Sequence, residues 1–399
     1  MQLRSKLAAF AGATLALPAA LNAQFSFPIR GREVQIHSFV SQGFGYSDHN
    51  NYLTMKTSRG SLAMTDFGVN VSSQITDKFR VGAQLYDRNL GNLGNWHPTV
   101  DWAFGDYQFK SWLGVRAGKV KTTLGLYNDT QDMEFLHTWA ILPQSAYPLD
   151  LRASTIAHTG ADLYGTFSLK ERGDISYTGY VGTRSPDKYG GYRYGLKPIG
   201  MDYSKESGWH TGGDLRWNNL VKGVLFGASF LHNPGNGIGT IQLAPGLTLP
   251  FESPTTSQHT AFYVEYRTGN LTINGEYRRE LIKGTEYIGG LPYADYEFDQ
   301  RGWYASASYR ICRRLELGTY HSRFYPLWDQ DHARPDNHIF DYVAAGKINL
   351  THQWDLKIEG HFMDGYGLYY ALRGFYPQDN PQGLHPKTNL LIVRTGWTF

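Results

Sequence analysis

The chain has 399 residues, a formal net charge of +3 and an unusual abundance of glycine and aromatic residues, with 45 Gly, 28 Tyr, 21 Phe and 10 Trp. Its mean hydropathy of −0.42 excludes a bundle of membrane-spanning helices, each of which needs roughly 20 apolar residues. The near-neutral charge excludes the basic surface expected of a nucleic-acid-binding protein, and the single cysteine, Cys312, excludes a disulfide framework or a cysteine-based zinc site. We therefore predict no metal, no cofactor and no nucleic-acid partner.

Residues 1–23 have the parts of a secretory signal peptide. Arg4 and Lys6 supply positive charge, an apolar stretch rich in Ala and Leu follows, and Ala23 is a small residue before the expected cleavage site. The alternative, an N-terminal anchor helix, is disfavoured because the apolar stretch is shorter than a membrane span. The sequence thus predicts export from the cytoplasm and a mature chain, residues 24–399, that forms a single domain.

Stretches of alternating apolar and polar residues recur along the whole mature chain. From Trp354 to Phe362, for example, the even positions are apolar or glycine and every odd position is ionisable. A period of two places the two sets on opposite faces of a strand. A buried sheet in a soluble protein can alternate in this way, but repetition at about ten residues per strand favours a membrane barrel.

Short polar links alternate with longer stretches rich in Gly, Pro and Asn. The short links lie near 76–78, 110–111, 171–174, 218–219, 269–270, 312–313 and 351–352. The longer stretches are 47–59, 89–97, 121–155, 185–206, 233–257, 284–298, 326–337 and 370–387. Short periplasmic turns and long outer loops are typical of single-chain membrane barrels with an even number of strands. The pattern predicts an all-β fold, a transmembrane antiparallel β-barrel of about sixteen strands.

The C-terminal residues, from Leu391 to Phe399, also alternate, with Trp397 on the mostly apolar face and Arg394 and Gly396 on the other. An alternating segment that ends on an aromatic residue resembles the last strand of outer-membrane β-barrels, which the barrel-assembly machinery recognises. The resemblance implies that Trp397 and Phe399 form this assembly signal. It also implies a place in the outer membrane of a Gram-negative-type bacterium, in contact with outer-membrane lipids.

Residues 121–155 form the longest predicted outer loop, the third along the chain. A barrel of about sixteen strands has a lumen too wide for side chains to fill. The strand layout, the long third loop and Phe399 resemble the general bacterial porins, and the segment from Gly114 to Lys121 resembles the phosphate-selective porin family. The resemblance implies a water-filled pore narrowed by the third loop, passive diffusion of ions and small hydrophilic solutes, and a homotrimer.

In such porins, acidic residues of the third loop face basic residues of the wall at the pore constriction. Carried over to this chain, the loop residues are Asp129, Asp132 and Glu134, and the wall residues are Arg80, Arg88 and Arg116. The alternation also points basic residues such as Lys347, Lys357 and Arg394, and acidic residues such as Asp355 and Glu359, into the lumen. Because these charges nearly cancel and pair across strands, the sign of any ion preference stays open.

Two other classes of barrel remain as alternatives. A non-channel receptor or adhesin would use its long loops for binding and would have a blocked lumen. A barrel hydrolase would need a nucleophile beside a base, and the adjacent His321 and Ser322 point to opposite faces of a predicted strand. We therefore predict a porin without enzymatic activity.

Overall fold

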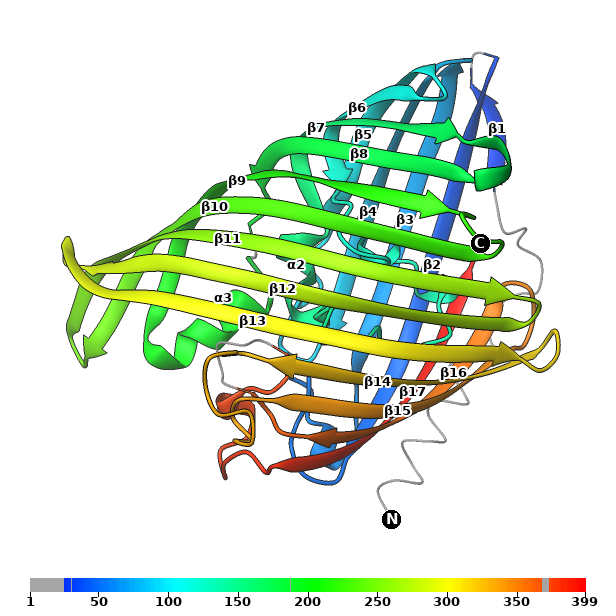
Figure 1. Ribbon diagram of the computed structural model, residues 1–399. Coiled ribbons are helices and arrows are strands. Elements are labelled where there is room, and N and C mark those ends of the chain that lie inside the picture. The colour runs from blue at the N-terminus through cyan, green and yellow to red at the C-terminus, as the bar shows by residue number, and fades with distance from the viewer. Residues whose placement is uncertain (1–24, 30, 187, 368–372) are drawn as a thin grey trace.

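The computed structural model describes residues 25–29, 31–186, 188–367 and 373–399, and its strands form one continuous sheet (Figure 1). Each strand from β2 to β17 pairs antiparallel with the next one along the chain, and β17 pairs with β2. The described strands therefore form a closed antiparallel barrel of 16 strands, as predicted. The predicted signal peptide, residues 1–23, lies outside the described residues.

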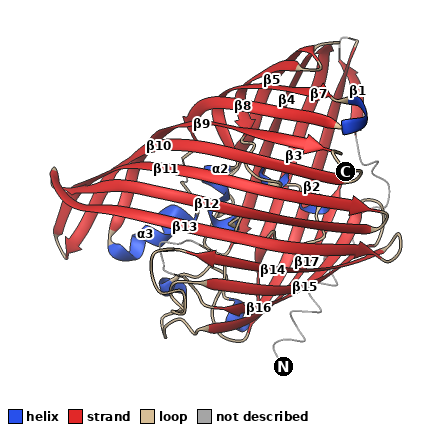
Figure 2. Ribbon diagram, in the orientation of Figure 1, coloured by secondary structure: helices blue, strands red, loops and turns tan. Residues whose placement is uncertain are grey.

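The strand bounds are β1 (Phe25–Ile29), β2 (Arg32–Ser47), β3 (Ser61–Thr76), β4 (Phe79–Leu90), β5 (Thr99–Lys110), β6 (Leu113–Lys121), β7 (Ala157–Ser168), β8 (Asp174–Arg184), β9 (Met201–Asn218), β10 (Val224–Ala244), β11 (Leu247–Thr268), β12 (Leu271–Ile288), β13 (Leu291–Arg310), β14 (Leu315–Tyr325), β15 (Ile339–Asn349), β16 (Trp354–Asp364) and β17 (Lys387–Thr398). The helices are α2 (Arg152–Thr155) and α3 (Gly191–Leu196), with single 3₁₀ turns such as η2 (Asn128–Thr130) and η3 (Glu134–Leu136). Figure 2 shows that strands dominate the molecule and that its helices are short. Among the described residues, no helix is both long enough and apolar enough to cross a membrane.

The strand β1 lies outside the closed ring. It pairs with Arg32 to Ile36 of β2, whereas β17 pairs with β2 only from Phe39 onward. The other edge of β2 is already occupied by β3, which pairs with Val34 and the residues after it. The strand β1 therefore continues the line of β17 along the same edge of β2.

The ring alternates between apolar side chains on its outer face and polar or small ones on its inner face. On β3, the exposed Phe67, Val69 and Val71 alternate with the buried Asp66 and Gly68. Exposed apolar residues continue this outer belt around the barrel at Leu85, Leu163, Val181, Leu215, Phe226, Phe262, Val264, Ile273, Leu317, Ile358 and Leu391. An apolar outer band over a polar interior is the arrangement of a transmembrane barrel.

Each predicted short link joins two consecutive strands, so those predictions are confirmed. Two predicted outer loops, 233–257 and 284–298, are wrong, because both segments are strand. β10 and β11 form one long hairpin, and β12 and β13 form another that turns at Gly289 and Gly290, which both have positive φ. In Figure 1 the ends of β9 to β13 project beyond the neighbouring strands on one side of the barrel.

Glycine and proline in 233–257 signalled a loop, but here the glycines serve close packing within the sheet. A Cβ atom on Gly237 would lie 2.0 Å from a ring carbon of Tyr203, so Gly237 leaves room for that ring to lie across β10. The glycine content of 233–257 therefore reflects packing within the sheet and not an outer loop.

Deletion of Phe399 should weaken closure of the barrel, because the backbone N–H and C=O of Phe399 both bond to Ser38, each at 2.8 Å. We expect a loss of about 1–3 kcal/mol in the free energy of unfolding, the net contribution of two hydrogen bonds. Urea unfolding of the barrel refolded in detergent micelles measures this. The Phe399→Leu variant keeps both backbone bonds and should lose less; equal losses in the two variants would contradict the prediction.

Candidate functional site

The connection between β6 and β7, residues 122–156, folds into the barrel and is called the third loop. Asn128 fastens its two ends together: the side-chain Nδ2 donates to the carbonyl oxygens of Thr122 at 2.7 Å and Thr155 at 3.0 Å. Short helical turns at η2, η3 and α2 give the loop a compact shape (Figure 1). Most of its side chains are buried, which makes it a folded element inside the lumen.

On one side of the lumen, ion pairs hold the loop to β4, β5 and β6. Lys121 Nζ lies 2.6 Å from the carboxylate of Asp132, which also accepts a hydrogen bond from Gln84 at 2.7 Å. Arg152 makes a two-pronged ion pair with Asp101, at 2.5 and 3.1 Å. Two-pronged arginine–carboxylate pairs fix orientation as well as distance, so this edge of the loop is held firmly.

On the opposite side, charged residues of β15, β16 and β17 bind the loop. The buried Lys357 lies 2.5 Å from the carboxylate of Glu134. Glu359 accepts hydrogen bonds from the backbone N–H groups of Ala140 and Ile141, at 2.8 and 3.1 Å. Buried charges are tolerated only when each is paired or hydrogen-bonded, and here the loop supplies the partners.

A third set of contacts joins the loop to β9, β10 and β12. The backbone N–H of Gly125 donates to Ser229 Oγ at 2.8 Å, and Arg278 donates to the carbonyl oxygen of Leu124 at 2.8 Å. The hydroxyl of Tyr147 donates to Glu276, which also pairs with Arg278. Together with the other two sides, these contacts attach the loop to strands around most of the ring.

Apolar packing adds to the polar contacts. The ring of Trp139 packs edge-on against Tyr320, with ring centroids 5.0 Å apart. A Cβ atom on Gly318 would lie 2.7 Å from the Trp139 ring, so the wall is shaped to receive this side chain. Ile141 belongs to a second apolar cluster that also contains Tyr52 and Phe375 from two other outer loops. The third loop is thus also held by apolar packing that it shares with the wall and with two other outer loops.

The predicted constriction residues do not pair with one another. Among the described residues, no ion pair joins Asp129, Asp132 or Glu134 to Arg80, Arg88 or Arg116. Arg80 and Arg116 share the carboxylate of Asp106 at 3.5 and 3.4 Å, and Arg88 donates to the carbonyl oxygen of Leu149 at 2.7 Å.

The partners that sequence reasoning missed are Lys121 and Lys357. Alternation did place Lys357 in the lumen. Its partner Glu134, however, lies 223 positions away in the sequence, so nothing in the local pattern joins the two residues. Lys121 ends β6 and lies only 11 positions before Asp132. Because Lys121 lies this close to Asp132 at the start of the loop, the pair of Lys121 with Asp132 was predictable from the sequence.

The loop's exposed charge is the acidic Asp129. Its carboxylate lies 3.9 Å from Arg216 of β9, and both side chains remain partly exposed, at 35% and 21%. Asp132 and Glu134 are by contrast buried. Asp129 and Arg216 are therefore more accessible to solvent than Asp132 and Glu134.

Burial shifts the pKa values of His137 and Asp150, two of the loop's ionisable groups. Burial lowers the pKa of His137 to about 4, so the imidazole is neutral near pH 7 and its Nε2 donates to Thr130 at 3.0 Å. Burial raises the pKa of the Asp150 carboxyl, which accepts hydrogen bonds from Gly374 and Tyr376, both at 2.9 Å. Asp150 thereby connects the third loop to the loop before β17.

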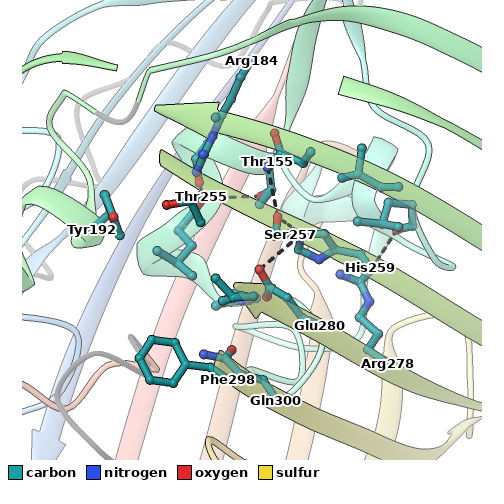
Figure 3. Close-up of a pocket in the computed structure, with 18 of the residues that line it drawn as sticks. Thr155, Arg184, Tyr192, Thr255, Ser257, His259, Arg278, Glu280, Phe298 and Gln300 are labelled. Atoms are coloured by element: carbon teal, nitrogen blue, oxygen red, sulfur yellow. Dashed lines mark hydrogen bonds and ion pairs between the residues drawn. The ribbon is translucent and has the colours of Figure 1, made fainter. Parts of the chain in front are cut away.

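A cavity of about 340 Å³ lies between the third loop and the inner faces of β8 to β13, and we call it the outer cavity (Figure 3). The projecting ends of β9 to β13 form its wall, and Tyr192 and Leu196 of α3 close one side. Within the described part of the chain, no group of three or more His, Cys, Asp or Glu residues is placed to hold a metal ion.

The Lys357→Met variant should destabilise the third loop, because it leaves the buried Glu134 carboxylate without its cation. Breaking a buried pair in this way costs about 3–5 kcal/mol, and we expect faster cleavage of the third loop by added protease and easier unfolding. The double variant Glu134→Gln/Lys357→Met should recover part of this loss. Lys283→Met, which removes an exposed ion pair with Glu297, is the control and should cost under about 1 kcal/mol. If the double variant lost the sum of the stability losses of the single variants Glu134→Gln and Lys357→Met, this result would contradict the pairing.

No family model matches the chain, and no curated protein matches it. Solved structures do match over nearly the whole chain. The outer-membrane-expressed OmpT of Vibrio cholerae has a TM-score of 0.59 and 9% identity, covering 94% of this chain and 100% of that one. The anion-selective porin from Comamonas acidovorans has a TM-score of 0.58 and 11% identity, covering 92% and 100%. The outer-membrane channel DcaP of Acinetobacter baumannii has a TM-score of 0.53 and 10% identity, covering 94% and 99%. At such low identity the matches establish the fold: this chain is a closed β-barrel of the architecture found in bacterial outer-membrane proteins.

Proposed function

We propose that this chain is an outer-membrane porin that admits ions and small hydrophilic solutes by passive diffusion through a lumen narrowed by the third loop. The observation that carries the proposal is the attachment of that loop, inside the barrel, to strands around most of the ring. In this proposal the signal peptide directs export, outer-membrane lipids surround the apolar belt, and Trp397 and Phe399 engage the assembly machinery.

The physical reason for an inserted loop is the width of the barrel. A ring of 16 strands encloses more space than its own inward side chains can fill. A loop held by buried ion pairs sets the size of the remaining passage and keeps that size constant, because each pair fixes a backbone segment against the wall. Such a passage sorts solutes first by size and then by charge.

The solved structures support the same proposal. Two of those that share the fold are named as a porin and as an outer-membrane channel. An in-vitro folded OmpT of Vibrio cholerae is described in a trimer form, with a TM-score of 0.57 and 9% identity, and on this likeness we propose a homotrimer. Passive diffusion requires no cofactor and no catalytic group, and none is assigned.

A second candidate is a barrel without an open channel, such as a receptor or adhesin. The observation that favours it is the same one: a loop attached around most of the ring also serves as a plug. Conductance separates the two readings, because a plugged barrel passes little current whereas a narrowed one passes current in discrete steps.

Excision of the third loop tests both readings. Asn128 bonds to the carbonyl oxygens of both Thr122 and Thr155, so the loop ends lie close enough for a Gly/Ser linker of about four residues to replace 124–154. In planar bilayers we expect small discrete steps from the parent chain and steps several times larger from the excised barrel, since the loop no longer fills the lumen.

Folded protein, shown by heat-modifiable migration on a gel, is the control for both chains. Steps from the excised barrel beside silence from the parent chain would support the plugged barrel. Silence from both folded chains would overturn the porin proposal.

Ion selectivity should depend on the exposed pair Asp129 and Arg216. We expect Asp129→Asn to shift the reversal potential across a salt gradient toward anions and Arg216→Gln to shift it toward cations, because each variant removes one charge beside the passage. Glu297→Gln, which removes an exposed carboxylate paired with Lys283, is the matched control and should shift it less. Equal reversal potentials in the parent chain and the three variants would contradict this prediction and place the passage elsewhere in the lumen.

A further inference from the structure

Some polar side chains that line the outer cavity have hydrogen-bonding atoms without a partner among the described residues. Its floor is the third loop, at Leu124, Asn128 and Thr155, and its walls are the inner faces of β8 to β13 (Figure 3). Most charged side chains on its walls have a partner. His259 pairs with Glu280 at 3.2 Å, and Glu206 pairs with Arg193 at 2.8 Å.

Arg184, the last residue of β8, is different. In the described part of the chain it makes no ion pair and no side-chain hydrogen bond, although it lines the cavity and is only partly exposed. A Cβ atom on Gly235 would lie 2.9 Å from a guanidinium nitrogen of Arg184, so the glycine of β10 leaves the space in which this side chain lies. Figure 3 shows Arg184 reaching across the wall of the cavity.

His210 of β9 also lines the cavity, and its side chain is 1% exposed. Neither ring nitrogen has a hydrogen-bond partner among the described residues. A buried polar group without a partner is unfavourable, so its presence on the wall of a cavity points to a ligand that completes it. Asn233 of β10 adds a third unsatisfied group, the side-chain oxygen Oδ1.

The rest of the lining is aromatic and apolar. Tyr203, Tyr296 and Phe298 line the side formed by the projecting strands, and Met201 and Ile282 lie among them. The flat rings and the apolar side chains favour a planar apolar body, which they can contact on its faces. A volume of about 340 Å³ lies within the range of small-molecule sites.

We propose that the outer cavity binds aromatic carboxylates, with the carboxylate between Arg184 and His210 and the ring among the aromatic side chains of β9 and β13. The guanidinium offers the paired donors that a carboxylate accepts, and the imidazole N–H gains the acceptor that it lacks. The acidic Glu286, near the outer end of β12, also lines the cavity and repels a carboxylate from that part of it. This inference rests on the proposed function, since it names a solute class held on the outer approach to the third loop.

Calorimetric titration of the detergent-folded barrel with 1-naphthoate tests the proposal. We expect Arg184→Met to weaken binding by tenfold or more and His210→Phe to weaken it by a smaller factor. Lys283→Met removes a cation from the outer face of the same wall and should leave binding within twofold. The neutral 1-naphthalenemethanol should bind more weakly than 1-naphthoate, and equally to the parent chain and to Arg184→Met.

Equal affinities for 1-naphthoate in Arg184→Met and Lys283→Met would overturn the proposal, as would equal affinities of the parent chain for the acid and the alcohol. Heat-modifiable migration confirms folding of each variant. Because binding is measured without a bilayer, absence of 1-naphthoate binding in a chain that conducts overturns only this inference. If the chain binds 1-naphthoate but conducts no current in bilayers, the result supports the binding site and overturns the porin proposal instead.

Discussion

A sheet that crosses a bilayer has to close, because an open edge would leave backbone N–H and C=O groups without partners in hydrocarbon. In this chain the closing pair is β17 with β2, and every other feature follows from it. Closure at 16 strands fixes a lumen wider than the inward side chains of the wall can fill, and a further element has room to occupy part of it. The third loop is that element, and its partners are the inward charges of the wall.

The loop and the wall depend on each other electrostatically. Lys357 and Glu359 would face open water in an empty barrel, but under the loop they are buried and need the partners that Glu134, Ala140 and Ile141 supply. Charges buried in pairs confer position more than stability, since apolar residues would pack as well without defining where the loop sits. In the porin that we propose, this fixed position of the loop would set what passes beside it.

Strand alternation and turn spacing were enough to predict the ring, its strand number and the inward direction of Lys357, because these depend on neighbours in the sequence. The pairing of Glu134 with Lys357 was not predictable, since it depends on how a long loop crosses the lumen. Residues 233–257 were misread because glycine serves both turns and close packing, and only the position of Tyr203 decides between them. His210 became significant only once its lack of partners was visible.

The short strand β1 limits how far β17 can extend along the edge of β2. It occupies β2 up to Ile36 on the edge where β17 begins its own pairing at Phe39. If β17 slipped by two residues toward β1, every side chain would stay on the same face of the sheet. The alternation of apolar and polar residues therefore does not prevent such a slip. With β1 in place, such a slip has no free edge to move onto. The strand β1 thereby blocks a slip of β17 in this direction, and with it one change in the shear of the whole ring.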